Sequence, residues 1–367
     1  MNVKERNYEI DILKGLAIIL VVMGHTNFGG TQFIYLFHMA VFFIASGYFY
    51  NSKKIVDFHG FIQYCLKKMK SLWFPYALWN TIFVLCNNLF IKLNVYTDNS
   101  GILDYTSNQF QVVHHHMNLV ESLKEILKGV FFLGGTTLGG AFWFLRMLFI
   151  ISILFAFIGY IIYKCKIKEK GMYIIQGVIS FVFLLIGYYM SVKGISLIGN
   201  IQRVFSCYIL YYLGILVRNV KFDKIAYKLG IMGISIAGLL VCLNYGNISL
   251  GSNSYPNPVF LLVASLLGWG LMYEIAYFIT KIKYVNKAIS CLGKYSLNIM
   301  ILHFLAFKIV SYIQVFMYEK PKYLVASFPV LYNHGAWWVI YTIVGVCIPV
   351  LFTFLWSELW KKIKARS

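Results

Sequence analysis

Long, uninterrupted runs of apolar residues leave few folds open to this 367-residue chain. A helix needs roughly 20 mainly apolar residues to cross the hydrocarbon core of a bilayer. Barrel strands are shorter and alternate in polarity, so continuous runs of this kind predict helices. The runs cover residues 10–26, 31–50, 72–91, 141–163, 171–191, 203–220, 225–243, 258–280, 291–316 and 335–360. We therefore expect an all-α, polytopic membrane bundle of about ten helices, with residues 1–367 forming one membrane domain.

The composition also favours a membrane protein over a soluble enzyme. Apolar residues make up 60% of the chain, and the charged fraction of 13% is about half that of a typical soluble domain. The net charge of +20 comes from 33 Lys and Arg against 13 Asp and Glu. These basic residues lie in short clusters between the apolar runs, as they do in cytoplasmic loops of membrane proteins. The lipid bilayer is thus the expected partner, and no nucleic acid is expected.

The basic clusters also predict which side of the membrane each loop faces. Most of the Lys and Arg residues fall in the loops on the side that holds both chain ends. Because short basic loops stay in the cytoplasm, both termini are predicted to be cytoplasmic. The longest segment of the other side, residues 92–140, is then an extracytoplasmic loop. Within it, the apolar spacing over residues 119–130 predicts a short amphipathic helix at the membrane surface or across the mouth of the bundle.

No pattern of metal ligands is evident in the sequence. The seven cysteines are scattered singly, without a CxxC pair, which favours buried reduced thiols. His114, His115 and His116 follow one another, so their side chains point in different directions on any regular element. This favours a solvated loop over a metal site, and no metal is expected.

Ionisable residues inside the predicted spans are the first candidates for function, because a charge in lipid is costly. Some candidates also have an alternative to a functional role. Glu274 would then form a simple ion pair with a neighbouring lysine, and a membrane histidine would form a hydrogen bond in helix packing. The candidates are Asp11, Lys14, His25, His38, Arg146, Arg203, Glu274 and His303.

The first span holds the most informative of these residues. Eleven positions separate Lys14 from His25, which places them within roughly 20° of one another around a helix and about 16 Å apart along it. Asp11 lies one turn before Lys14 and is in position to neutralise it. The spacing therefore connects an anion site near the cytoplasmic end to an imidazole near the outer side.

The stretch from Tyr8 to Gly24-His25 resembles the opening signature of the acyltransferase family 3 membrane proteins. The resemblance continues in order over nearly the whole chain, and it is similar to the branch with fucose 4-O-acetylase-like and exopolysaccharide-modifying members. Many relatives have Arg where this chain has Lys14, and an Arg pair where it has lysines before the third span. The further matching stretches are Phe37-His38-Met39, Phe74-Pro75-Tyr76, Phe142-Trp143-Phe144-Leu145 and Gly293-Lys294-Tyr295-Ser296-Leu297 leading to His303.

The resemblance implies an O-acyltransferase that moves an acyl group, usually acetyl from cytoplasmic acetyl-CoA, to a hydroxyl of a cell-surface or lipid-linked glycan. His25 would be catalytic, either as a general base or as a transient acyl carrier. Asp11 would orient Lys14, and Lys14 would contact the CoA moiety. A neutral imidazole suits proton transfer near pH 7.

Other residues would bind the substrates in this interpretation. Lys67 and Lys70 would meet the phosphates of acetyl-CoA, or they reflect topology alone. His38 and Arg146 would contact the acceptor or the developing oxyanion near the outer mouth, with snorkelling or packing as the alternative. His303 would join the same site, on the resemblance more than on spacing.

Two other classes of function fit the same features. One is an exporter of a glycan or small metabolite that uses histidines as proton relays. The other is a non-catalytic subunit of the polysaccharide-synthesis machinery. The chain has no evident internal repeat and few acidic residues within spans, which favours the enzyme. The expected location is the plasma membrane of a bacterium.

Overall fold

The computed structural model describes residues 8–105, 110–220 and 222–364, and this part of the chain is helical without a β-strand. The chain ends predicted to be cytoplasmic, residues 1–7 and 365–367, lie outside it. Within the described ranges, eight segments are long and apolar enough to cross a membrane. They are Thr31–Tyr48, Gly140–Lys164, Glu169–Val192, Ile198–Val217, Ile225–Tyr245, Pro258–Thr280, Ser296–Met317 and Trp337–Lys364. The predicted polytopic helical bundle is confirmed.

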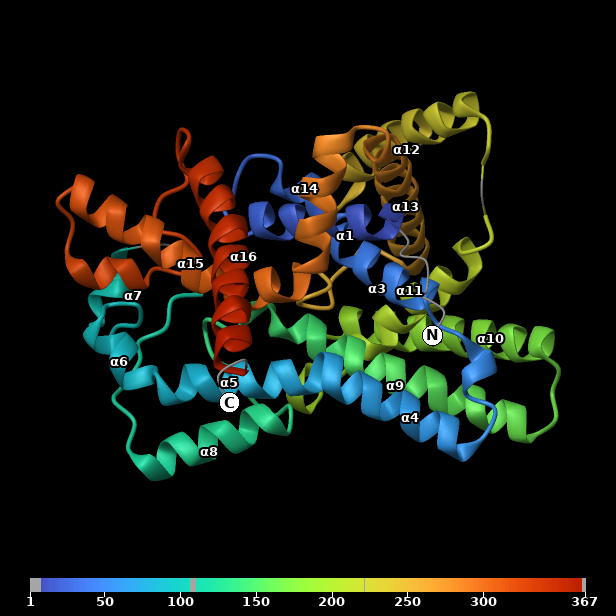
Figure 1. Ribbon diagram of the computed structural model, residues 1–367, viewed down its shortest axis with the longest axis horizontal. Helices are drawn as coiled ribbons and strands as arrows, with labels where there is room; N and C mark the ends of the chain where they lie inside the picture. The colour runs from blue at the N-terminus through green and yellow to red at the C-terminus, as the bar shows by residue number, and fades with distance from the viewer. Residues whose placement is uncertain (1–7, 106–109, 221, 365–367) are drawn as a thin grey trace.

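The first and third of the ten predicted spans do not have this length and composition. Helix α1 (Tyr8–Gly24) has 17 residues, although the backbone N–H of His25 still donates to Val21 and Val22. The third predicted span belongs to a longer rod. There, α4 (Phe58–Lys68), the π-helical turn η2 (Met69–Trp73) and α5 (Phe74–Leu85) follow one another directly, as Figure 1 shows. The rod includes lysines that the sequence analysis had placed in a loop.

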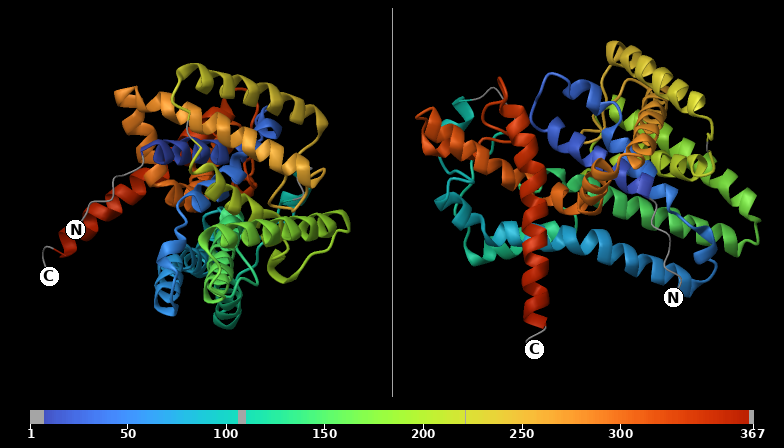
Figure 2. Two further views of the ribbon diagram at one scale, coloured as in Figure 1. Left: turned by 90° about the vertical axis from the view of Figure 1, so that its right-hand side faces the viewer. Right: turned by 45° about the horizontal axis from the view of Figure 1, so that its top comes forward.

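The remaining elements complete the bundle in chain order. They are α2 (Thr31–Tyr35), α3 (His38–Tyr48), η1 (Ser52–Lys54), α6 (Asn87–Lys92), α7 (Gly101–Tyr105), α8 (Leu119–Val130), η3 (Gly140–Phe142), α9 (Trp143–Lys164), α10 (Glu169–Val192), η4 (Ile198–Asn200), α11 (Arg203–Val217), α12 (Ile225–Tyr245), α13 (Pro258–Thr280), α14 (Lys283–Lys294), α15 (Ser296–Met317), η5 (Lys322–Ala326) and α16 (Trp337–Lys364). Figure 2 shows α16 extending away from the other helices towards its C-terminal end.

Helix α1 lies inside the bundle and contacts α3, α13, α14, α15 and α16. Its side chains are apolar on several faces, and Ile12, Leu13 and Ala17 are fully buried. Close approach of neighbouring helices depends on glycine, as it commonly does in membranes. A Cβ atom on Gly47 of α3 would lie 1.8 Å from the carbonyl oxygen of Tyr211 in α11. This packing holds α3 in place and with it the histidine at its start.

Helix α8 has the same bounds as the predicted amphipathic helix, Leu119–Val130. Its start has a capping box, in which the Asn118 side chain accepts from the Glu121 N–H and the Glu121 carboxylate accepts from the Asn118 N–H, both at 2.9 Å. Leu119 and Val120 are exposed. The end of α8 packs on the rod, where Trp73 Nε1 donates to the carbonyl oxygen of Val130 at 3.2 Å. This contact fixes where the following glycine-rich segment, residues 131–140, begins.

Candidate active site

Three histidines lie close together, and we call them the histidine layer: His25, which directly follows α1, His38 of α3 and His303 of α15. The rings of His25 and His303 stack with 5.3 Å between centroids and 20° between planes. His38 and His303 both lie within electrostatic range of His25. The structure therefore brings together three residues that the sequence analysis had assigned to one site from different spans.

Hydrogen bonds to backbone carbonyls fix the orientation of two of these rings. A carbonyl oxygen can only accept, so His38 Nδ1–H donates to Ile34 at 2.9 Å and His303 Nδ1–H donates to Ile299 at 3.0 Å. The other nitrogen of the neutral His303 ring is then an acceptor. His303 is fully buried, and its Nε2 atom has no hydrogen-bond partner in the described part of the chain. The layer thus holds an unused proton acceptor beside the half-buried His25 ring.

A pocket of 520 Å³ lies between the histidine layer and the N-terminal half of α1, and we call it the inner pocket. Its volume is in the range of small-molecule sites. Asp11, Lys14 and Lys294 line it, whereas its remaining wall is mostly apolar and includes Phe42 and Met300. Met300 lies three residues before His303 on α15, a rise of about 4.5 Å. The inner pocket therefore runs from a charged end to within one helical turn of the histidine layer.

The packing of α14 against α1 brings Lys294 to the pocket. A Cβ atom on Gly293 would lie 1.8 Å from the carbonyl oxygen of Asp11, and one on Gly15 would lie 2.1 Å from that of Ile289. Only glycine permits this contact, since any side chain would force the helices apart. Lys294 had no predicted role in the site, although it lies within the Gly293-Lys294 motif that carried the resemblance.

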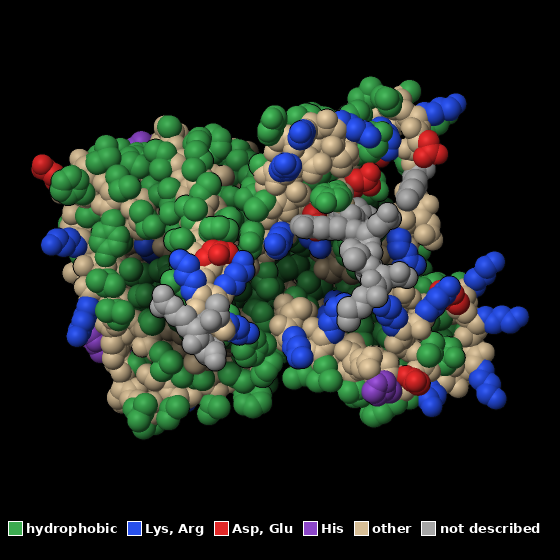
Figure 3. Space-filling model, viewed as in Figure 1, with side chains coloured by type: hydrophobic (Ala, Val, Ile, Leu, Met, Phe, Trp, Pro, Cys, Tyr) green, Lys and Arg blue, Asp and Glu red, His purple; other side chains and the backbone are tan. Residues whose placement is uncertain are grey.

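The rod of α4, η2 and α5 supplies further lysines. Lys67 and Lys70 line an adjoining pocket of 450 Å³, and Ser71 lines both this pocket and the inner pocket. Ser71 lies within the π-helical turn, and such turns often occur at functional sites. In Figure 3, Lys and Arg side chains gather around a hollow in the middle of the face shown. We call the four lysines that line the two pockets the basic rim: Lys14, Lys67, Lys70 and Lys294. Their positive charge is suited to an anionic ligand.

Arg146 is placed elsewhere. Its Nη1 atom donates to the carbonyl oxygen of Phe132 at 2.9 Å, and its side chain lines a separate pocket at the start of α9. Arg203 lies nearby, with its guanidinium 5.5 Å from the centre of the Trp143 ring. Arg146 is therefore not among the residues that line the inner pocket in the described part of the chain, and it has a second arginine as a neighbour.

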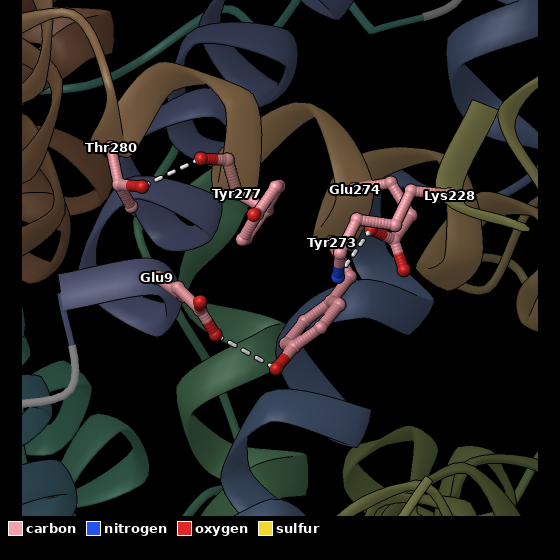
Figure 4. Close-up of polar contacts among 6 residues, drawn as sticks. All are labelled: Glu9, Lys228, Tyr273, Glu274, Tyr277 and Thr280. Carbon is pink, nitrogen blue, oxygen red and sulfur yellow. Dashed lines mark hydrogen bonds and ion pairs between the residues drawn. The ribbon is translucent and has the colours of Figure 1, made fainter. Parts of the chain in front are cut away.

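Glu274 forms the ion pair that was the alternative to a role in the site. Its carboxylate lies 3.3 Å from Lys228 Nζ, and Lys228 also lies 3.9 Å from the centre of the Tyr277 ring. Next to this pair, the Tyr273 hydroxyl donates to Glu9 at 2.8 Å (Figure 4). These contacts join α13 to α12 and to α1. None of these residues is among those that line the inner pocket, and the predicted ion pair of Glu274 with a neighbouring lysine is confirmed.

Lys308 is a buried charge that was not among the predicted candidates. Lys308 lies in α15, is 3% exposed, and donates to the carbonyl oxygens of Ala326 at 3.0 Å and Ser327 at 2.7 Å. The signal was available, because a lysine interrupts an apolar run there. His114 lies within range of its charge and stacks on Tyr96 with 3.9 Å between centroids. The solvated-loop interpretation is therefore wrong for His114, whereas the neighbouring His115 is exposed.

Within the described residues, no three His, Cys, Asp or Glu side chains are grouped in a way that would hold a metal ion. Comparisons with curated proteins and with solved structures gave no match. A family model described as an acyltransferase domain, that of acyltransferase family 3, matches residues 7–354. The match includes the histidine layer and all residues of the inner pocket. The chain therefore belongs to acyltransferase family 3 and is a multi-pass membrane protein with an acyltransferase domain.

Proposed function

We propose that this protein is an O-acyltransferase that moves an acyl group, acetyl in the first instance, from cytoplasmic acyl-CoA to a hydroxyl of a cell-surface or lipid-linked glycan. One observation carries the proposal. The inner pocket has Lys14 and Lys294 at one end and stops within a helical turn of His303 at the other. Such a pocket suits a donor with phosphates at one end and a thioester at the other.

The basic rim would bind the phosphates of the donor. Lys14 and Lys294 line the inner pocket, and Lys67 and Lys70 line the pocket beside it. An ammonium group binds phosphate as a point charge and can follow it in several geometries, unlike the fixed fork of an arginine. Asp11 shares the wall with Lys14 and would set its position. The apolar part of the wall would then pack against the pantetheine arm.

The histidine layer would carry out the transfer. The oxygen of the glycan hydroxyl attacks the carbonyl carbon of the thioester, so that an O–C bond forms and the C–S bond breaks. The proton of the hydroxyl passes to His25 and then to the departing thiolate sulfur. His303 Nε2, which lacks a donor, would accept a hydrogen bond and help to align the reacting groups. A covalent route, in which His25 takes the acyl group first, differs in one observable: the donor alone would then label the protein.

The reaction would take place in the plasma membrane of a bacterium, with the donor entering from the cytoplasm and the acceptor from the opposite side. An association with the polysaccharide-synthesis machinery would supply that acceptor. The basic clusters at the predicted cytoplasmic ends support this orientation.

Mass spectrometry of surface glycans from cells with and without the gene tests the proposal. We expect acyl groups on the glycan only when the gene is present, and their loss with His25→Ala while glycan export and protein abundance stay unchanged. Loss of glycan export in the His25→Ala strain would instead indicate a transporter and would overturn the proposal.

A further inference from the structure

A separate pocket lies at the start of α9, at the end opposite to Lys164, and the chemistry proposed above leaves it without a role. It has a volume of 350 Å³, and we call it the outer pocket. One wall is the glycine-rich segment of residues 133–140. The other wall consists of side chains from the rod, from α9 and from the turn before α11, namely Tyr76, Asn80, Trp143, Arg146 and Asn200.

Two deeply buried side chains of the outer pocket have polar atoms without a hydrogen-bond partner in the described residues. Arg146 is 8% exposed, and its Nε atom has no acceptor. Asn80 is 2% exposed; its Nδ2 donates to the carbonyl oxygen of Tyr76 at 2.9 Å, but its Oδ1 receives no donor. A buried polar atom left in this way costs roughly 1–3 kcal/mol. Both atoms indicate a ligand that completes their hydrogen bonds.

The charge of the outer pocket is positive. Arg146 lines the pocket, whereas Arg203 lies behind this lining, within electrostatic range of Arg146. The Nε atom of Arg203 is buried and has no hydrogen-bond partner among the described residues. No Asp or Glu is among the residues of the structure that line the pocket. Two neighbouring guanidinium groups repel each other unless an anion lies between them, and carboxylates and phosphates fit their fork-shaped donors. The missing ligand is therefore expected to be anionic.

The rest of the pocket suits a sugar ring close to the reaction centre. Tyr76 and the half-buried Trp143 offer aromatic surface, which packs well against the C–H face of a sugar. A Cβ atom on Gly140 would lie 3.2 Å from the ring of Phe304, and that ring lies 4.8 Å from the His25 ring. A single side chain, Phe304, thus touches both the wall of the outer pocket and the proposed base.

We propose that the outer pocket binds the acceptor and that this acceptor is an anionic saccharide, bearing a carboxylate or a phosphate. Arg146 binds the acid group, and the charge of the neighbouring Arg203 strengthens this binding. Trp143 packs on the sugar ring, and Asn80 accepts a hydrogen bond from a sugar hydroxyl. This inference rests on the proposed function, since it names the class of its acceptor. Carboxylate and phosphate present the same chemistry to the arginines, so the experiment compares both.

Binding to the full chain in nanodiscs of zwitterionic lipid, measured by calorimetry without any acyl donor, tests the inference. The probes are a disaccharide containing a hexuronic acid, a sugar 1-phosphate and a neutral disaccharide. We expect at least one anionic probe to bind about tenfold or more tightly than the neutral one, with an affinity that falls as salt is added. The tighter of the two anionic probes identifies the acid group.

Variants then locate the site. Arg146→Gln and Arg203→Gln are expected to weaken binding of the anionic probe by roughly tenfold or more, whereas Arg146→Lys, which keeps the charge without the fork, has an intermediate effect. Lys193→Gln removes an exposed charge outside the pocket and leaves the affinity unchanged. Should an arginine variant fail to fold, Trp143→Phe tests the same pocket by weakening binding of the saccharide.

Equal binding of all three probes, or loss of binding in Lys193→Gln as large as in the arginine variants, would overturn the inference. Acyl transfer to a neutral glycan with undiminished rate in Arg203→Gln would also overturn it while leaving the proposed function intact. Conversely, binding of the anionic probe by a protein that transfers no acyl group would refute the proposed function and retain the pocket as an anionic saccharide site.

Discussion

The imidazole rings of His25 and His303 stack at 5.3 Å, although 278 positions of the chain separate them. His303 Nδ1–H donates to the carbonyl oxygen of Ile299, whereas no hydrogen bond joins the His25 ring to the backbone of the described residues. His303 is therefore held in one orientation, whereas His25 lies at the end of α1 and is half-buried. This difference suits a fixed His303 ring that aligns the reactants and a His25 ring that exchanges a proton.

Replacing His25 by Asn should lower the rate of acyl transfer by roughly 100- to 10,000-fold, the usual contribution of a positioned general base. His303→Ala should have a smaller effect, because it removes an aligning contact. Transfer of labelled acetyl from acetyl-CoA by the protein in nanodiscs measures both. The exposed His115→Ala serves as the matched control and should retain full activity. A His25→Asn enzyme with a normal turnover number would remove His25 from the chemistry.

Lys14 lines the charged end of the inner pocket, so its loss should affect the donor more than the acceptor. We expect Lys14→Gln to raise the KM for acetyl-CoA roughly tenfold or more with little change in thermal stability, as expected for one charge-assisted contact to phosphate. Lys170→Gln removes an exposed charge away from this pocket and is the control. An unchanged KM in Lys14→Gln would mean that the phosphates bind elsewhere.

The helical class and the candidates His25 and His38 could be predicted because they rest on local information, whereas His303 joined the predicted site on the resemblance. Apolar run length identifies a membrane helix, and an ionisable residue within such a run is conspicuous. Contacts between distant helices are not visible in this way. Lys294 was not predicted to join the site, because its place in the inner pocket depends on the close approach of Gly293 to the backbone of Asp11. Arg146 lies in a predicted span, but the sequence could not show that it lines the outer pocket together with Asn80 and Trp143.

The contact between Gly293 and the carbonyl oxygen of Asp11 leaves no room for a methyl group. Gly293→Ala should therefore move α14 away from α1, cost about 1–3 kcal/mol in stability and raise the KM for the donor. Gly230→Ala is a matched control in helix α12, since a Cβ atom there meets no other atom within 4 Å. The thermal midpoint and donor KM of both variants in nanodiscs provide the measurement. Equal behaviour of the two would show that α14 does not depend on this contact.

The ion pair of Lys228 and Glu274 should contribute to stability without contributing to turnover. Both side chains are more than nine-tenths buried, so Glu274→Gln leaves the lysine charge without its partner and should cost roughly 3–5 kcal/mol. The double variant Lys228→Met, Glu274→Leu removes both charges and should recover most of that loss. Thermal unfolding in detergent measures the stability, and acyl transfer per folded molecule should not change. Lower transfer by the folded double variant would give the pair a role in the site.

The segment around His114 should lose stability in mild acid. Burial lowers the pKa of His114 from 6.5 to about 4, and the charge of Lys308 lowers it as well. Within that interval the unfolded segment binds a proton that the folded segment does not, so the stabilisation is present above about pH 6.5 and is lost as the pH falls towards 4. The amide of His114, which donates to the carbonyl oxygen of Thr97 at 2.7 Å, reports this opening by hydrogen exchange. After correction for intrinsic exchange rates, the protection of this amide should decrease as the pH falls from about 7.5 to 5.

Two variants serve as controls for this prediction. His114→Gln should abolish the pH dependence of the protection, and the exposed His115→Gln should keep it. Protection that stays constant over this range in the unmodified protein would show that the buried ring does not control the segment.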